Sequence, residues 1–176
     1  MSNDNFTRLM AYVGEYLEYR DDFGSLVWKK IPPRSRGRIA VGDVAGTLVK
    51  GYRRIKIQGC IYSAHRIVWA MHHGAWPDAI IDHEDRNREN NRISNLRAAS
   101  VAQNSWNANV KSNNKLGIKG VAKTRYGKYE ARVSAHGKAY FLGSFSSLRE
   151  AVAAHNQATK TLHGEYRPEG AVNPLM

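Results

Sequence analysis

Alternation of hydrophobic and polar residues predicts a small sheet in the last third of the chain. Short strands are expected at Gly120–Lys123, Tyr129–Ser134 and Ala139–Leu142. Turn-forming pairs separate them, at Tyr126-Gly127 and His136-Gly137. Because both connections are short, neighbouring strands are expected to run antiparallel.

A helix is expected directly after this sheet, because the apolar pattern changes to a helical repeat. The repeating positions are Leu148, Ala151, Val152, His155, Ala158 and Leu162. Ser147 and Glu150 have the spacing of a capping box at its start, and Gly164 suits its end. The C-terminal segment is therefore predicted to be one unit of sheet and helix.

The N-terminal half has a less regular pattern. Ser25–Lys29, Arg54–Ile57 and Cys60–Tyr62 are predicted to be antiparallel strands that extend one platform. A helix capped by Ser63 is expected to follow, ending near residue 73. The Pro- and Arg-rich segment 32–38 is either a loop that follows a phosphate backbone or a mobile loop, and the sequence favours neither.

Residues 107–116 separate the two halves, because they are polar and lose the apolar repeat. We therefore expect an N-terminal domain at 1–108, a linker at 109–116 and a C-terminal domain at 117–176. The predicted fold class is α+β.

Charge narrows the choice of partners. The chain has 27 Lys and Arg against 15 Asp and Glu, a formal net charge of +12, and a sequence pI near 10.0. Residues 1–108 carry 16 basic and 11 acidic side chains, a net of +5, and residues 109–176 carry 11 and 4, a net of +7. This excess is typical of a protein that binds a polyanion, although basic charge also serves solubility alone.

The cysteine count and the hydropathy exclude several classes of protein. Cys60 is the only cysteine, so neither an internal disulfide nor a cysteine-rich zinc ribbon can form, and Cys60 is expected in a strand as a small apolar residue. No apolar run approaches the length of a membrane span, and the first residues do not resemble a signal peptide. We expect an intracellular protein without a membrane partner.

Candidate chemistry lies at the end of the apolar run Ala79–Ile81, where Asp82 and His83 follow. A carboxylate holds a hard divalent cation, and an imidazole accepts a proton from water near neutral pH. A capping box at Ser100 to Gln103 predicts a helix that carries Asn104, a further oxygen ligand, in its first turn. The alternative is structural: Asp-His pairs are common at strand ends, and the nearby asparagines could simply satisfy a polar loop.

The block Ile81–Arg97, with Asp82-His83 at its start and Asn95-Leu96-Arg97 at its end, resembles the HNH nuclease motif. The stretch from Tyr62-Ser63-Ala64-His65-Arg66 to Asn107 resembles the phage and intron-encoded branch of that family, and the likeness covers roughly residues 10–108. It implies two strands and a helix wrapped around one metal ion.

By this resemblance, His83 is the general base that activates water and Asn95 holds the loop. Asp82 and Asn104 are the metal ligands. Asn104 stands where many relatives have histidine, which favours Mg²⁺ or Mn²⁺ over zinc. Arg86 replaces the usual loop glycine, so a turn that needs a positive φ would be strained here.

Residues 117–168 resemble the ethylene-response-factor type of DNA-binding domain. The likeness rests on Gly120-Val121, Gly127-Lys128-Tyr129, Leu142-Gly143-Ser144-Phe145 and the run from Glu150-Ala151 to Ala158. In that family the sheet lies in the major groove and the helix supports it from behind. Tyr129, Ala131 and Val133 would then face the helix, and Glu130, Arg132 and Ser134 would face DNA.

Site preference does not carry over from that family, because Ala122 and Thr124 stand where it has base-reading arginines. Phosphate contacts dominate such interfaces, so roughly half of the candidates are expected to touch only the backbone. Across both halves, the candidate DNA-binding residues are Lys119, Lys123, Arg125, Tyr126, Lys128, Arg132, Lys138, Arg66 and Arg97.

Together these features predict a site-preferring DNA endonuclease of the homing type that hydrolyses phosphodiester bonds with Mg²⁺ or Mn²⁺. One chain offers one active site, so a monomer or weak dimer would nick one strand of double-stranded DNA at a time. If phage-encoded, the protein would work in the cytoplasm of a bacterial host. The alternatives are a non-cleaving DNA-binding regulator with a vestigial nuclease motif, and an RNA-directed protein, for which no RNA-binding signature is present.

Overall fold

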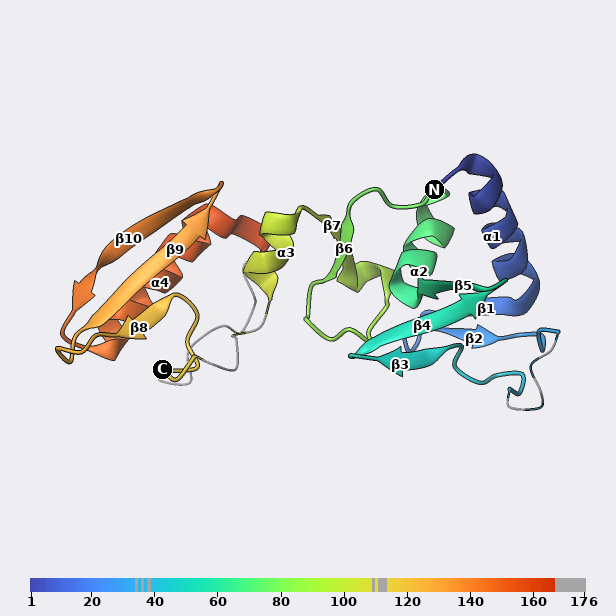
Figure 1. The fold of residues 1–176 in the computed structure, drawn as a ribbon, viewed down its shortest axis with the longest axis horizontal. Coiled ribbons are helices and arrows are strands. Elements are labelled where there is room, and N and C mark those ends of the chain that lie inside the picture. The colour runs from blue at the N-terminus through green and yellow to red at the C-terminus, as the bar shows by residue number, and fades with distance from the viewer. Residues whose placement is uncertain (34, 36, 38, 109, 111–113, 167–176) are drawn as a thin grey trace. The chain divides into compact units, whose positions relative to one another are not determined.

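A computed structural model describes the chain except residues 34, 36, 38, 109, 111–113 and 167–176. Residue contacts divide it into two compact units, Met1–Ala98 and Ala99–Met176, which are considered separately (Figure 1). The chain is a mixed α and β protein with several small sheets. Among the described residues, no helix is both long and apolar enough to cross a membrane.

The first unit begins with helix α1 (Asn3–Tyr16) and the hairpin of β1 (Leu17–Arg20) and β2 (Ser25–Trp28). The sequence pattern did not reveal α1 or β1. The strand predicted at Ser25–Lys29 is present as β2, which pairs with β1 in a two-stranded sheet of its own.

A second sheet follows, in which β4 (Tyr52–Ile57) lies between β3 (Thr47–Val49) and β5 (Cys60–Ser63), all antiparallel. The predicted hairpin of β4 and β5 is confirmed. Cys60 lies in β5 as expected, but its side chain is exposed, so it does not act as a packed apolar residue.

Helix α2 (Ala64–His73) has the predicted bounds, although the Ser63 side chain makes no capping hydrogen bond. It buries one apolar face, including Ile67 and Val68, and packs against β6 (Ile80–His83). Strand β7 (Leu96–Ala99) pairs with β6, after a single 3-10 turn at Ile93–Asn95.

One hydrophobic core holds this unit together. Leu9, Val13 and Leu17 from the N-terminal segment meet Ile55, Ile67 and Ile81 from the later elements, and all are nearly inaccessible to solvent. Each such side chain stabilises the fold by about 1.5–3 kcal/mol through burial. The core thereby fixes the end of β6, where Asp82 and His83 lie.

The second unit begins with helix α3 (Val101–Asn107) and continues with β8 (Val121–Lys123), β9 (Tyr129–Ala135) and β10 (Lys138–Phe145). The three strands form an antiparallel sheet with β9 in the middle, as predicted. Helix α4 (Leu148–His163) covers one face of this sheet (Figure 1). A 3-10 turn, Gly164–Tyr166, ends the described chain.

Alternating burial in β9 follows the predicted pattern. Ala131 and Val133 are buried beneath α4 with Val121 and Ala151, whereas Arg132 is exposed on the opposite face. Both predicted capping boxes are present, at the starts of α3 and α4. The boundary between the two units falls within β7, whereas the N-terminal domain was expected to end at residue 108. Part of the expected linker 109–116 lies outside the described residues. Arg34, Arg36 and Arg38 lie outside them as well.

Candidate active site

His83 is the last residue of β6, and its imidazole is only 3% exposed. Its Nε2 lies 3.0 Å from Oδ1 of Asn91. The amide nitrogen of Asn91 donates to the carbonyl of Glu89 at 3.2 Å, so Oδ1 must be the atom that faces the ring. Nε2 therefore carries the hydrogen and donates it, which leaves Nδ1 as the unprotonated nitrogen.

The surroundings of His83 keep its ring neutral. Burial lowers the pKa of His83, against the opposing effects of the Asn91 hydrogen bond and the charges of Asp85 and Asp82. A neutral imidazole near pH 7 can accept a proton, as a general base must.

Two aromatic rings pack beside His83. The ring of His65, on α2, lies edge-on to it at 5.0 Å between centroids, and Tyr52 of β4 lies at 6.1 Å. Burial, reinforced by the charges of His83, Arg66 and Arg54, lowers the pKa of His65 to about 3. His65 is therefore uncharged at neutral pH and adds no positive charge that would compete with protonation of His83.

Asp82 precedes His83 and is 8% exposed. Its Oδ2 accepts hydrogen bonds from Nη2 and Nε of Arg97, at 3.2 and 3.3 Å, and Arg97 also lies 3.7 Å from Glu84. The guanidinium offsets the cost of burying the Asp82 carboxylate. Arg97, a predicted DNA contact, is thus paired within the site.

Asp82 is the candidate metal donor in this part of the site. Within the described part of the chain, no cluster of three or more His, Cys, Asp or Glu side chains could hold a metal. A zinc site of histidines and cysteines is therefore not built there. Mg²⁺ is commonly bound by one or two carboxylates, with water and substrate phosphate filling its other positions, and Asp82 suits that role.

Asn95 holds the loop between β6 and β7. Its amide donates to Oδ1 of Asp85 at 2.9 Å and to the carbonyl of Asn90 at 2.7 Å, while its Oδ1 accepts from the backbone N–H of Asp85 at 3.0 Å. Burial alone would raise the pKa of the Asp85 carboxyl group. Hydrogen bonds from Asn90, Asn87 and Asn95 outweigh that effect and hold the pKa of Asp85 below its ordinary value. These contacts join Asn95 to two other positions of the loop, and its role in holding the loop stays a prediction.

The loop turns through Arg86, which has a φ of +64° and whose N–H donates to the carbonyl of His83 at 3.0 Å. This is the left-handed conformation that the usual glycine adopts without strain. The arginine makes the same turn at a cost of about 1–2 kcal/mol.

The β1–β2 hairpin holds the far side of this loop. The Asn91 N–H donates to the carbonyl of Gly24 at 3.1 Å, and the hydroxyl of Tyr19 accepts from the backbone N–H of Ile93 at 3.1 Å. Arg92 donates to the carbonyls of Asp21, at 3.1 Å, and of Asp22. The hairpin therefore fixes the residue that orients His83.

Sequence reasoning missed Asn91 as the partner of His83, and it also missed Tyr52. Asn91 lies in the run Asn87 to Asn95, which offers several equivalent amides. Only the hairpin contacts select one of them. Since α1 and β1 were not expected, no sequence signal pointed to that selection.

Asn104 lies on α3, in the second unit, and its pairing with Asp82 stays a prediction. Arg66 donates to the carbonyls of Pro77, at 2.6 Å, and Ala79, at 3.2 Å, and lies over the Trp76 ring. It thus ties the segment after α2 to that helix. Lys119 donates to backbone carbonyls at the end of α3.

The other candidates gather around the sheet of the second unit and are exposed: Lys123, Arg125, Tyr126, Lys128, Arg132 and Lys138. Arg125 lies over the ring of Tyr126 at 4.7 Å, and Arg132 lies over Phe141 at 5.6 Å. Arg132 also pairs with Glu130 at 3.1 Å. This arrangement of cations on aromatic rings gives the face both positive charge and flat apolar surface.

Comparison with known proteins agrees with this geometry. The family described as HNH endonuclease matches residues 62–106, which contain α2, β6, the loop, β7 and most of α3. The chain is similar to an uncharacterised HNH endonuclease of Acanthamoeba polyphaga mimivirus, with 34% identity over 104 residues, 58% of this chain and 54% of that protein. It is similar to Protein 3.8 of Escherichia phage T7, with 34% identity over 104 residues, 85% of that protein.

The match thus spans about half the length of the mimivirus relative and most of the phage protein. No solved structure is significantly similar to the chain. The matched segment contains the buried Asp82-His83 pair and the loop that orients it. The chain belongs to the HNH endonuclease family.

Proposed function

We propose that the chain is a metal-dependent endonuclease that hydrolyses phosphodiester bonds of double-stranded DNA, with His83 as its general base. The observation that carries this proposal is the neutral, buried imidazole whose Nε2–H is held by Asn91. That hydrogen bond fixes both the tautomer and the direction of the ring. Proton transfer by a positioned side chain contributes about 10²–10⁴-fold to a rate.

In the proposed reaction, Nδ1 of His83 takes a proton from a water molecule as the water oxygen attacks phosphorus. The bond from phosphorus to the 3′ oxygen breaks, and the products carry a 5′-phosphate and a 3′-hydroxyl. Asn91 keeps the imidazolium in place because its Oδ1 continues to accept from Nε2. The burial that lowers the pKa of His83 also favours release of the proton afterwards.

Asp82 would hold the divalent ion, and Asn104 is the second proposed ligand. A bound Mg²⁺ or Mn²⁺ would polarise the scissile phosphate and neutralise charge on the leaving oxygen. Arg97 forms an ion pair with Asp82 at 3.2 Å within the buried site.

The exposed sheet face of the second unit is the proposed DNA-reading surface. Support comes from its cations and from the +7 net charge of residues 109–176. A site preference of the homing type would come from this face, and the family likeness to a phage protein is in keeping with it. With one active site per chain, a monomer would nick one strand. The retained Asp82, His83 and Asn95 favour this over a non-cleaving regulator.

A cleavage assay tests the proposal. Purified full-length protein is incubated with one long DNA duplex, with and without Mg²⁺, and the products are run on native and denaturing gels. Cleavage that depends on Mg²⁺ and appears first on the denaturing gel is expected. No cleavage with Mg²⁺ or Mn²⁺ at any enzyme concentration would contradict the proposal.

A further inference from the structure

Helix α3 carries Asn104, yet it is too short to be stable alone. It has seven residues, Val101–Asn107, and isolated helices shorter than about 12–15 residues are marginal in water. Its order must therefore come from contacts outside the helix. Among the described residues of the second unit, three contacts act on α3.

The first contact is at the C-terminal end of α3. Nζ of Lys119 donates to the carbonyls of Ser105, Trp106 and Ala108, at 2.6, 3.0 and 3.1 Å. These carbonyls lack partners within the helix, and a cation there also interacts favourably with the helix dipole. One ammonium group thus donates hydrogen bonds to three backbone carbonyls at the end of α3.

The second contact is at the side of the helix. The indole of Trp106 stacks on the ring of His163, with centroids 4.3 Å apart and planes 7° from parallel. His163 ends α4, and its Nε2 donates to the carbonyl of Ser134 in β9 at 3.0 Å. Trp106 is therefore held against the sheet-and-helix unit through His163.

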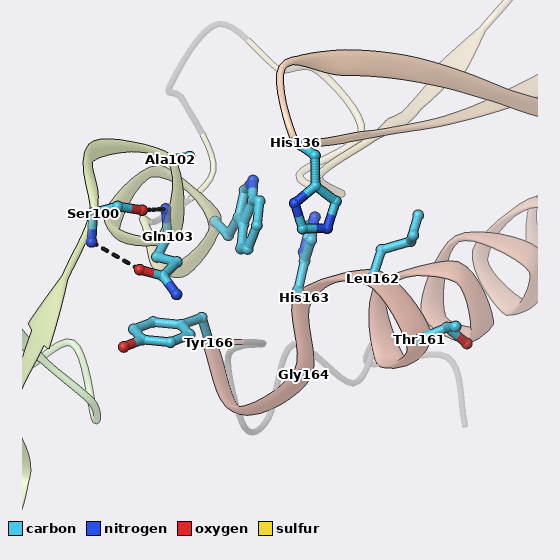
Figure 2. A pocket seen from close by; sticks show the side chains of 10 residues that line it. Ser100, Ala102, Gln103, His136, Thr161, Leu162, His163, Gly164 and Tyr166 are labelled. Atoms are coloured by element: carbon cyan, nitrogen blue, oxygen red, sulfur yellow. Dashed lines mark hydrogen bonds between the residues drawn. The ribbon is translucent and has the colours of Figure 1, made fainter.

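The third contact is with the β9–β10 turn. The ring of His136 lies edge-on to Trp106 at 6.0 Å. Figure 2 shows His136 and His163 close together, with the capped start of α3 at Ser100 and Gln103 beside them. A hollow of about 490 Å³ lies between these groups. Residues of the second unit thus contact α3 at its C-terminal end and along the side that carries Trp106.

We infer that Lys119, Trp106 and His163 are positioning residues of the nuclease, through which the C-terminal unit fixes the helix that carries Asn104. The inference rests on the proposed function, because the role of Asn104 as a metal ligand belongs to it. The C-terminal unit is then part of the catalytic apparatus as well as a DNA-reading module. We call the contact of the Lys119 ammonium with the carbonyls at the end of α3 the anchor. In this inference Lys119 makes that contact and does not contact DNA phosphate.

The test uses the full chain with Lys119→Met, which keeps an unbranched apolar side chain and removes the ammonium group. The matched control is Lys160→Met, an exposed lysine of α4. Three quantities are measured: amide hydrogen exchange over residues 101–108 without metal or DNA, DNA affinity without metal, and the Mg²⁺ concentration that gives half-maximal cleavage.

Lys119→Met is expected to speed exchange in α3 by about tenfold, which corresponds to about 1.4 kcal/mol. Exchange in β9 stays unchanged. The Mg²⁺ requirement is expected to rise by about tenfold, the lower end of what loss of a ligand-supporting group costs. DNA affinity stays unchanged, and Lys160→Met changes neither exchange nor the Mg²⁺ requirement.

A different set of results would overturn the inference. If Lys119→Met leaves α3 exchange unchanged but weakens DNA binding, with a salt slope smaller by about 0.9, Lys119 is a phosphate contact and the anchor is wrong. Faster exchange with an unchanged Mg²⁺ requirement would refute the coupling. A wild-type protein that never cleaves DNA would instead contradict the proposed function, and the exchange measurement would still decide whether the anchor exists.

Trp106 supplies an independent check. Trp106→Phe keeps a ring to stack on His163, whereas Trp106→Ala removes it. Metal dependence close to wild type in Trp106→Phe, together with a raised Mg²⁺ requirement in Trp106→Ala, is expected. An equal defect in both variants, with β9 exchange also faster, would mean that Trp106 acts on the stability of the whole unit and would contradict a positioning role.

Discussion

At the scale of single residues, the chemistry of His83 comes from its neighbours. Burial lowers its pKa, Asn91 fixes its tautomer, and the uncharged ring of His65 lies edge-on beside it. An exposed histidine would titrate near pH 6.5 with either nitrogen protonated. The fold thus keeps this ring neutral and fixes its tautomer, which suits the proposed role of His83 as a base.

Asn91 provides the most specific prediction at this scale. Asn91→Ala removes the acceptor of the Nε2–H, so the ring loses its fixed tautomer and the single-turnover cleavage rate should fall by at least about tenfold. Asn91→Asp keeps an acceptor and adds a negative charge, which raises the pKa of His83. At high pH, the cleavage rate of Asn91→Asp should therefore be closer to that of wild type than the rate of Asn91→Ala is. On acidification, its rate should begin to fall at a higher pH than the wild-type rate does.

The pH–rate profiles of wild type and Asn91→Asp test whether His83 is the titrating base. Wild type should lose activity on acidification with an apparent pKa below the ordinary histidine value of 6.5. Identical acid limbs in wild type and Asn91→Asp would show that His83 is not the titrating base.

His65 makes a prediction about stability. Its folded pKa is about 3 and its unfolded value about 6.5, so the unfolded chain binds one more proton between these pH values. The free energy of unfolding should therefore fall on acidification, with His65 contributing up to about 1.4 kcal/mol per pH unit. His65→Gln should reduce this slope in urea unfolding between pH 6.5 and 4, and His72→Gln, an exposed control, should not. Equal slopes in wild type and His65→Gln would contradict the assignment.

At the scale of elements, the β1–β2 hairpin positions the catalytic loop. Gly24 has a φ of +61°, and a Cβ added there would lie 2.8 Å from the backbone nitrogen of Arg92. Glycine is thus required where the hairpin meets the loop that carries Asn91. Burial, with a hydrogen bond to Asp21, raises the pKa of Tyr19 to about 12, so this hydroxyl stays protonated and accepts from the Ile93 N–H of the loop at 3.1 Å.

Gly24→Ala should therefore push the loop away from the hairpin. We expect a loss of about 1–3 kcal/mol in stability and a decrease in cleavage rate at unchanged DNA affinity. Gly14→Ala in α1 is the matched control, because no atom lies within 4 Å of its added Cβ and alanine favours a helix. Denaturant unfolding and single-turnover cleavage measure both effects. Equal behaviour of the two variants would show that the hairpin does not position the loop.

The Asp82–Arg97 pair links the two strands of the site. The side chains are 9% and 14% exposed, so Arg97→Ala leaves a buried carboxylate without its guanidinium and should cost about 3 kcal/mol or more. Arg20→Ala, which breaks the exposed pair with Asp22, should cost about 1 kcal/mol or less. Mg²⁺ should restore part of the loss in Arg97→Ala. A loss no greater than that of Arg20→Ala would contradict a structural pair.

Sequence patterns predicted best the elements that depend on local signals. Helix α4, its capping box and the antiparallel strands β8 to β10 follow from periodicity and turn residues, and α2 has the expected bounds. The pattern did not predict α1, β1 or the separation of β2, because these depend on contacts between distant segments. For the same reason, the sequence identified Asp82, His83 and Asn95 as candidates but not Asn91, whose role depends on the hairpin.

At the scale of the whole molecule, charge is shared between the units but concentrated in the smaller one. The net charge of +12 includes +7 from residues 109–176. Exposed cations on and around the sheet provide much of that charge. Long-range attraction to the proposed DNA substrate would therefore act on both units, while the C-terminal unit is expected to supply most phosphate contacts.

Replacing Arg125, Lys128 and Arg132 together with glutamine should weaken DNA binding and flatten its salt dependence. Each lost phosphate contact lowers the slope of log affinity against log salt by about 0.9, so the triple variant should lose about 0.9 to 2.7. Fluorescence anisotropy over a salt series measures the slope. A slope equal to that of Lys160→Gln would show that this face does not bind DNA.

The most direct test of the central claim is the single-turnover cleavage rate of His83→Ala, measured with saturating Mg²⁺ beside the DNA affinity of the same variant. Because the base acts in the transition state and not in substrate binding, the rate should fall by about 10²–10⁴-fold while the dissociation constant for DNA stays within about twofold of wild type. A His83→Ala protein that cleaves DNA at the wild-type rate would contradict the account.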